Sequence, residues 1–155
     1  VLVAGRPEAA PPHPAVWRAV ADEVPGSGPL GGIHAGLKAM TKPLGFVVAC
    51  DMPRLDPSVI RRQLAVARRS GADAVVPTWD GYLEPLHAVY SRRCLGAIER
   101  KLAEGERRIR SFFPLVDLFP WDVRAEGIAP EVFANINTRA DYLAFIARSG
   151  RPSSP

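Results

Sequence analysis

Residues 46–53 read Phe-Val-Val-Ala-Cys-Asp-Met-Pro, an apolar run that ends in an aspartate and a proline turn. The apolar run predicts a buried strand over residues 45–50. Ligands of open α/β sheets bind beyond the carboxyl ends of the strands, so Asp51 stands where a binding site is expected. A carboxylate at that place suits Mg²⁺, which takes one or two carboxylates together with substrate phosphates. Capping of the turn before Pro53 is the alternative explanation of Asp51.

Outward from this stretch, strand-like runs alternate with helical patterns along the chain. This alternation is typical of an α/β sheet. The expected strands are 1–4, 45–50, 72–77 and 85–90, and the expected helices are 57–70, 92–104 and 139–148.

The helix expected over residues 57–70 has signals at both ends. Asp56 can cap it with Pro57 at its first position, and Gly71 supplies the stop. Three apolar residues spaced for one helical stripe predict its buried face, namely Ile60, Leu64 and Ala67.

Composition indicates one soluble globular domain, because 47% of the 155 residues are apolar and 23% are charged. We expect the domain to cover residues 1–148 and residues 149–155 to form a disordered tail. Apolar runs such as residues 46–50 are far shorter than the stretch of about 20 that a membrane-spanning helix needs. No charged-then-apolar signal segment opens the chain, so a cytoplasmic location and no membrane partner are expected.

The two cysteines, Cys50 and Cys94, lie well apart and have neither a disulfide framework nor zinc-site spacing, so both are expected to be reduced. The net charge of +4 comes from 20 Lys+Arg against 16 Asp+Glu. The arginine pairs are spread along the chain without interleaved aromatics, which favours solvated helix faces. Nucleic-acid binding through these arginines is therefore the weakest functional interpretation, and no nucleic-acid partner is expected.

A second candidate site is the glycine-dense segment at residues 26–37, which runs into a short helix. Glycines let backbone N–H groups approach a ligand closely, and the helix N-terminus that follows favours anionic groups. Asp22 lies just upstream and is a candidate second polar arm of the site; an exposed carboxylate at a helix end is the alternative. The candidate contacts of the segment are Gly28, Pro29, Leu30, Gly31 and Gly32.

Near the end of the chain, residues 133–143 place Asn135 and Asn137 on the same side of an extended segment that leads into a helix. Thr138 is expected to cap this helix, with Asp141 three residues on completing an imperfect capping box. Asparagine side chains donate and accept hydrogen bonds without charge, which suits the edge of a heterocycle. Turn formation alone also explains Asn137.

In order and wording, these stretches resemble the molybdenum cofactor guanylyltransferase family, MobA-like enzymes of the broader nucleotidyltransferase and GT-A-like fold. The resemblance covers residues 1–147. Its motifs are GPLGGIxxGL at 28–37, VVACDMP at 47–53, EPLHAVY at 84–90 and FxNINT at 133–138, and residues 105–112 also look like a family segment that precedes a late strand. The fold that it implies is a three-layer, Rossmann-like α/β sheet.

The resemblance implies transfer of GMP from GTP to molybdopterin with release of pyrophosphate. Asp51 would correspond to the metal-binding and catalytic aspartate, with Mg²⁺ as cofactor. Asp22 and the segment 28–32 would contact the guanine nucleotide, and Asn135 and Asn137 would lie toward the pterin. Molybdoenzymes or their chaperones are the implied protein partners. The strand at 84–90 is expected to line the site, with no role assigned to Glu84 or His87; His34 and His87 are expected to be packing or surface residues.

Relative to that family, the chain has no counterpart of the signature loop LAGGxSxRMGxDK. It begins with Val1, in what looks like the family's second strand, so we expect a first strand, the loop and a helix to be missing. Loss of the central strand would leave two strand edges unpaired, and we expect such an incomplete domain to fold poorly by itself.

Three alternatives to the guanylyltransferase remain open at this point. One is a cytidylyltransferase or another nucleotidyltransferase of the same fold that acts on a sugar or cofactor. Another is a non-catalytic, truncated remnant that binds molybdopterin or a partner enzyme, for which Asp51 would be dispensable. The third is nucleic-acid binding, which would show a steep salt dependence and no need for GTP.

Overall fold

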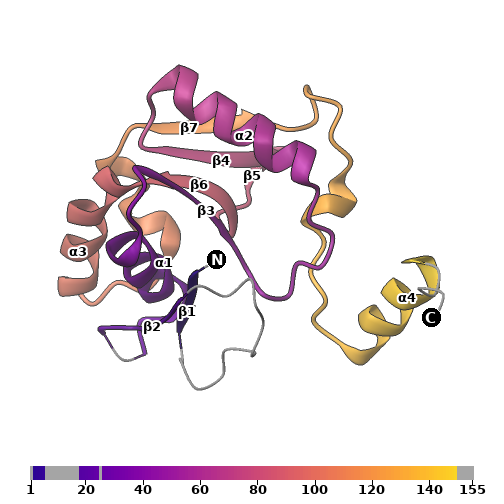
Figure 1. Cartoon of the computed structure of the whole chain (residues 1–155), viewed down its shortest axis with the longest axis horizontal. Coiled ribbons are helices and arrows are strands. Elements are labelled where there is room, and N and C mark those ends of the chain that lie inside the picture. The colour runs from indigo at the N-terminus through magenta and orange to yellow at the C-terminus, as the bar shows by residue number, and fades with distance from the viewer. Residues whose placement is uncertain (1, 6–17, 25, 150–155) are drawn as a thin grey trace.

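A computed structural model of the chain describes residues 2–5, 18–24 and 26–149 (Figure 1). Its main sheet has five strands in mixed orientation. The order is β3 (Leu44–Val48), β6 (His87–Ser91), β4 (Ala74–Trp79) and β5 (Tyr82–Leu83), with β7 (Leu118–Asp122) pairing with β4. Only the β4–β7 pair is parallel within this sheet; the other pairs are antiparallel.

The strands alternate their side chains between two helical layers, as the pleat of a strand requires. On one face, Val75 and Val89 pack with α2 (Pro57–Ser70). On the other face, Val76 and Tyr90 pack with residues of α1 (Gly28–Ala39) and α3 (Leu95–Ala103). Figure 1 shows α2 separated from α1 and α3 by the sheet. The expected three-layer α/β fold is therefore confirmed.

A smaller parallel sheet joins β1 (Leu2–Gly5) to β2 (Arg18–Ala21), and both strands contact α1. Within the described part of the chain, β1 pairs only with β2, and β3 pairs only with β6. The expectation that a first strand, a loop and a helix are missing stays a prediction.

The helix α2 has the predicted ends. The Asp56 carboxylate accepts from the Ser58 N–H (2.7 Å), and Gly71 ends the helix with a left-handed φ of 69°. The predicted stripe is confirmed at Ala67, whereas Ile60 and Leu64 are only half-buried. The fully packed side chains of α2 are Val59, Gln63, Val66 and Ala67.

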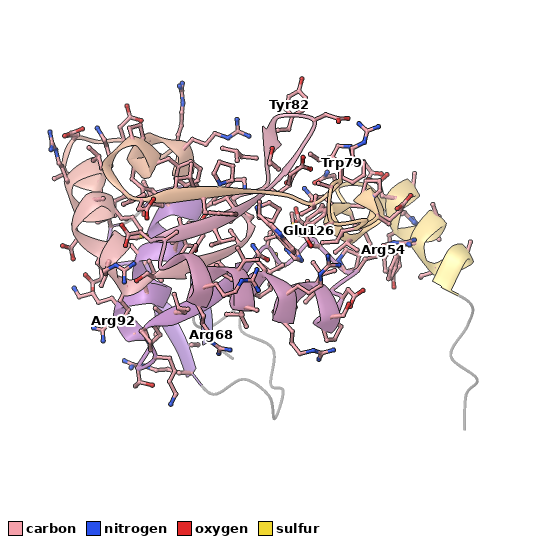
Figure 2. The ribbon with its side chains drawn as sticks, turned by 90° about the horizontal axis from the view of Figure 1, so that it is seen from above. Arg54, Arg68, Trp79, Tyr82, Arg92 and Glu126 are labelled. Carbon is pink, nitrogen blue, oxygen red and sulfur yellow. The ribbon has the colours of Figure 1, made fainter. Side chains whose placement is uncertain are left out.

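Other boundaries also differ from the expected ones. The strand expected to reach residue 50 ends at Val48, and the helix expected over 92–104 begins as the 3₁₀ helix η2 (Arg92–Cys94) before α3. The hairpin between β4 and β5 was not predicted; its turn, Asp80-Gly81, has φ values of 48° and 82°, which Asp-Gly pairs adopt readily. Tyr82 projects from this hairpin (Figure 2).

The last third of the chain leaves the sheet through η3 (Ile109–Leu115), β7 and η4 (Pro130–Phe133), and ends in α4 (Arg139–Ser149). Figure 1 shows α4 set apart from the three layers. Ser149 is the last residue of α4, and residues 150–155 of the expected tail lie outside the described residues. Among the described helices, none is long and apolar enough to cross a membrane.

Candidate active site

Asp51 lies in the turn that follows β3. The Ala49 N–H donates to the Leu86 carbonyl (3.0 Å), which continues the pairing of β3 with the β6 side, and the Met52 N–H closes the turn onto Ala49 (3.3 Å). The Asp51 side chain is half-buried, and its Oδ1 atom is buried without a hydrogen-bond partner in the described part of the chain. A buried carboxylate oxygen without a partner is costly, so this atom is suited to accept a ligand or a cation.

The segment that carries Asn135 and Asn137 is bonded directly to this turn. The Ile136 N–H donates to the backbone carbonyl of Asp51 (2.8 Å), although the two residues lie far apart in sequence. The structure therefore brings Asp51 together with the two asparagines that the sequence singled out, and both asparagine side chains are exposed.

The capping box at the start of α4 fixes the end of the asparagine segment. Asp141 Oδ2 accepts from the N–H of Thr138 (2.8 Å) and of Asn137 (3.1 Å), and Thr138 Oγ1 accepts from the Asp141 N–H (3.1 Å). These hydrogen bonds, led by the side-chain bond with Thr138, hold the pKa of Asp141 below its usual value. The predicted capping box is confirmed, with aspartate in the place of glutamate.

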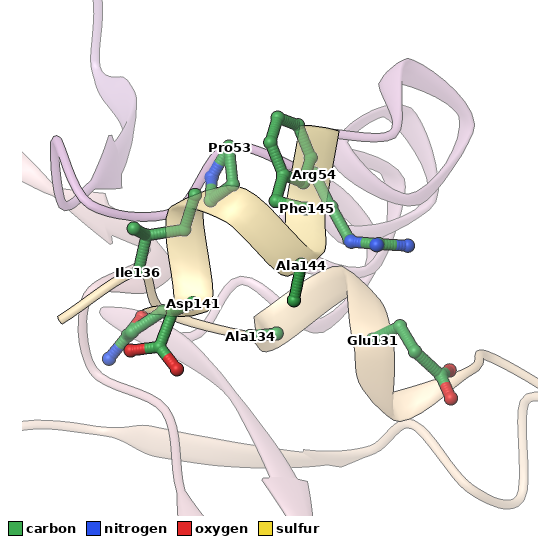
Figure 3. A pocket seen from close by; sticks show the side chains of 9 residues that line it. Pro53, Arg54, Glu131, Ala134, Ile136, Asp141, Ala144 and Phe145 are labelled. Atoms are coloured by element: carbon green, nitrogen blue, oxygen red, sulfur yellow. The ribbon is translucent and has the colours of Figure 1, made fainter. Parts of the chain in front are cut away.

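A pocket of about 230 Å³ opens between the Asp51 turn and α4 (Figure 3). Its walls come from three places in the chain: Pro53 and Arg54 after the turn, residues around η4, and α4. The Arg54 guanidinium carbon lies 5.4 Å from the centroid of the Phe145 ring. The remaining lining residues are Glu131, Ala134, Asn135, Ile136, Asp141 and Ala144.

His87 supports the site from beneath. Its ring lies edge-on to Phe46 of β3 and to Phe133 of η4, with centroids 4.8 Å apart in each case. The side chain is fully buried, neither ring nitrogen has a described hydrogen-bond partner, and burial lowers the pKa of His87. The neutral imidazole thus packs Phe133, two residues before Asn135, against the strand that leads to Asp51. The expectation that His87 is a packing residue agrees with this position.

The candidate nucleotide contacts belong to the smaller sheet and α1. Asp22 follows β2, and its Oδ1 atom is buried without a described partner. The segment expected to be a glycine loop is helical from Gly28 onward, so only residues before Gly28 form a loop. Ser27 does not cap the helix by its side chain; its hydroxyl donates to the Val24 carbonyl (2.6 Å). The backbone N–H groups in the first turn of α1 therefore receive no side-chain hydrogen bond from Ser27.

Gly31 lies inside α1 where Ser27 approaches the helix too closely for any side chain. A Cβ atom there would lie 1.8 Å from Ser27 Oγ and 3.6 Å from the carboxyl carbon of Asp22. Gly28 and Pro29 are exposed at the start of α1, whereas Leu30 is 0% exposed in the core. Any contact of Leu30 with a ligand would therefore run through its backbone, not its side chain.

The two cysteines do not form a disulfide. Both are free, as predicted; Cys50 is exposed and Cys94 is buried. Burial, with Asp73 nearby, raises the pKa of the Cys94 thiol to about 12, so this thiol stays protonated at neutral pH.

The family model for the MobA-like NTP transferase domain matches residues 1–117, which include Asp22, α1 and Asp51. The chain belongs to this family. It is 37% identical over 142 residues to a probable molybdenum cofactor guanylyltransferase of Pelotomaculum thermopropionicum, covering 86% of this chain and 68% of that protein. It is 34% identical to the molybdenum cofactor guanylyltransferase of Syntrophotalea carbinolica, covering 92% and 68%.

Solved structures agree with this family membership. Molybdopterin-guanine dinucleotide biosynthesis protein A from Archaeoglobus fulgidus superposes with a TM-score of 0.73 at 30% identity, covering 82% of this chain and 65% of that one. The 2-C-methyl-D-erythritol 4-phosphate cytidylyltransferase of Thermus thermophilus, at 18% identity and a TM-score of 0.71, shares the fold. The chain thus spans about two thirds of the length of its MobA-like relatives.

Sequence reasoning missed several residues of the site. Arg54, Glu131 and Phe145 line the pocket, and none of them was predicted. Arg54 could have been found from the sequence because it follows Asp51 by three residues, in the same turn region. Phe145 follows Asp141 by four positions, so both lie on one side of α4.

Proposed function

We propose that the protein transfers GMP from GTP to molybdopterin and releases pyrophosphate. Its family membership and the names of its relatives support this activity. The structural observation that carries the proposal is the joined pair of Asp51 and the Asn135–Asn137 segment, linked by the Ile136 N–H bond to the Asp51 carbonyl. That junction brings the Asp51 carboxylate, whose buried Oδ1 has no partner in the described part of the chain, next to neutral hydrogen-bonding side chains.

In this proposal Asp51 holds Mg²⁺. The unpartnered Oδ1 of Asp51 fits that role, and no group of three or more His, Cys, Asp or Glu side chains in the described part of the chain forms a closed metal cage. One carboxylate is sufficient for Mg²⁺ when substrate phosphates supply further oxygens. When bound, the ion neutralises charge on the triphosphate and on the leaving pyrophosphate.

The guanine nucleotide is assigned to the start of α1. Asp22 and the first helical turn, from Gly28 to Gly32, would contact it, with Leu30 taking part through its backbone. Amide groups at a helix N-terminus attract anionic and hydrogen-bonding groups. The Asp22 carboxylate, whose buried Oδ1 has no partner among the described residues, would accept from N–H groups of the base.

The acceptor is assigned to the opposite side of Asp51, where Asn135 and Asn137 can donate to and accept from the pterin. A phosphate oxygen of molybdopterin forms the new bond to the α-phosphorus of GTP. The bond from that phosphorus to the bridging oxygen breaks, and pyrophosphate leaves with the electron pair. Because the phosphate itself attacks, the chain's residues need only position both substrates and stabilise charge.

We place the enzyme in the cytoplasm as one domain over residues 1–148, with molybdoenzymes or their chaperones receiving the finished cofactor. Pull-down of such a partner by the nucleotide-loaded protein would test that delivery.

The activity is tested by incubating the full chain with Mg²⁺, molybdopterin and either GTP or CTP, and measuring pyrophosphate and the dinucleotide mass. Pyrophosphate and the guanine dinucleotide with GTP are the expected products. Turnover with CTP alone would replace the proposal with a cytidylyltransferase. Binding of molybdopterin without turnover of either nucleotide would replace it with a non-catalytic binding module.

A further inference from the structure

Arg54 is a half-buried cation in the pocket beside Asp51. It lines the pocket together with Asn135, and its guanidinium lies over the Phe145 ring at 5.4 Å from the centroid (Figure 3). No described carboxylate lies within ion-pair distance of Arg54; four described arginines, Arg93 and Arg124 among them, do have such a partner. The described structure therefore gives Arg54 an aromatic support but no anionic partner.

Stacking on an aromatic ring prepares an arginine to bind an anion. The guanidinium carbon of Arg54 lies 5.4 Å from the Phe145 centroid, within cation–π range, and a cation–π contact does not use up the N–H donors. The same contact restricts the side chain before the ligand arrives, which reduces the entropy lost on binding. Two parallel N–H donors match the spacing of two phosphate oxygens.

The other charges of the pocket are compatible with one bound phosphate. The Asp141 carboxylate already accepts from the backbone N–H groups of Thr138 and Asn137, so part of its charge is offset at the start of α4. Glu131 is an exposed carboxylate on the pocket wall and opposes the anion in part. Solvent screens the repulsion between the exposed Glu131 carboxylate and the phosphate. It screens the attraction between the half-buried Arg54 guanidinium and the phosphate less.

The position of Arg54 decides which phosphate it takes. The turn after β3 runs between α1 on one side and α4 on the other (Figure 1), and Arg54 faces α4. Given the function proposed above, the GTP phosphates belong to the α1 side. We propose that Arg54, held by Phe145, binds the phosphomonoester of the pterin acceptor and so positions the attacking phosphate next to Asp51. This inference rests on the proposed function for the identity of the acceptor.

Two fluorescent probes separate the phosphate from the pterin ring: 6-hydroxymethylpterin and its monophosphate ester, each titrated into the full chain without nucleotide. The wild-type protein should bind the phosphorylated probe roughly 10- to 100-fold more tightly, the range for hydrogen bonds to a charged group. Arg54→Gln should abolish that preference and leave the affinity for the unphosphorylated probe unchanged. Arg54→Lys should keep part of it, because lysine supplies charge without the planar fork.

Arg68→Gln is the matched control, since Arg68 is exposed on α2 and lies well away from Arg54 (Figure 2). It should keep the full preference, and circular dichroism should show all variants folded. Equal binding of both probes to the wild-type protein, no binding of either, or an undiminished preference in Arg54→Gln would overturn the inference. No GTP is present in this assay, so its result does not depend on turnover. If the protein shows the Arg54-dependent preference but does not transfer GMP, the proposed function is wrong and the inference about Arg54 still holds.

Discussion

The helices α1 and α4 carry the two proposed halves of the site but are held in different ways. The side of α1 that meets the core buries six residues: Leu30, Gly31, Ile33, His34, Ala35 and Leu37. By contrast, α4 exposes Tyr142, Leu143 and Ile146, with 52%, 56% and 41% of their surfaces accessible. Phe145 of α4 contacts Arg54, and α4 forms one wall of the pocket.

The two sides of the proposed site therefore depend on core packing to different degrees. The proposed nucleotide side is built on α1, which packs into the main core. The proposed acceptor side is built on α4, which has little buried surface and is the kind of segment that opens locally at low cost. Substitutions on α1 should therefore change stability, and substitutions around α4 should change ligand binding.

The largest expected contrast comes from truncating one leucine on each helix. Leu30→Ala removes a side chain that is 0% exposed and should lower the free energy of unfolding by about 2–5 kcal/mol. Leu143→Ala, at an exposed position of α4, should change it by less than about 0.5 kcal/mol. Urea titration followed by circular dichroism measures both. Equal losses would show that α4 is packed as firmly as α1.

A second contrast lies within α1 itself. Gly31→Ala places a methyl group against Ser27 and should cost about 1–3 kcal/mol of stability and weaken GTP binding, because Ser27 and Asp22 must move. Gly36→Ala meets nothing within 4 Å and should stabilise the helix by about 0.5–1 kcal/mol. Urea titration and GTP binding by calorimetry test the pair. A Gly31→Ala protein as stable as Gly36→Ala would refute the close approach.

The pH dependence of stability should report His87, which packs between Phe46 of β3 and Phe133 of η4. Burial lowers the pKa of His87 in the folded protein, so the unfolded chain takes up a proton first as the pH falls. The free energy of unfolding should therefore decrease from about pH 6.5 downward, toward the folded-state pKa. His87→Gln should make the slope between pH 7 and pH 5 shallower. Identical slopes in the two proteins would exclude this linkage.

The smallest expected effect is on the acceptor side. Glu131→Gln removes an exposed carboxylate from the pocket wall and should tighten binding of the phosphorylated pterin probe by roughly 2- to 5-fold, since an exposed charge contributes little. Stability should not change. Weaker binding in this variant would mean that Glu131 accepts N–H groups of the ligand instead of opposing its phosphate.

Local signals predicted much of the fold and part of the site. An apolar run that ends in a polar residue placed Asp51 at the end of a strand, and Asp56, Pro57 and Gly71 marked both ends of α2. The Thr138 cap of α4 was predicted in the same way. Each of these features depends on residues within a few positions of one another, which is why the sequence alone specifies them.

Features that depend on distant partners could not be predicted. Gln63 is fully buried in α2 because its amide donates to the carbonyls of Val75 (3.0 Å) and His87 (3.1 Å) on the sheet. The contact of Arg54 with Phe145 likewise joins residues far apart in the chain. The glycine segment was misjudged because several glycines together suggest a loop, whereas Gly31 serves a close approach inside a helix.

The most direct test of the proposed catalytic role is the rate of pyrophosphate release with GTP, molybdopterin and Mg²⁺ for Asp51→Asn and for Asp80→Asn. Asp80 is an exposed carboxylate on the β4–β5 turn, where asparagine tolerates the positive φ. Asp51→Asn should lose at least about 100-fold in kcat with unchanged stability, and Asp80→Asn should match the wild type. An Asp51→Asn protein that turns over within twofold of the wild type would contradict the assignment of Asp51 as the catalytic metal ligand.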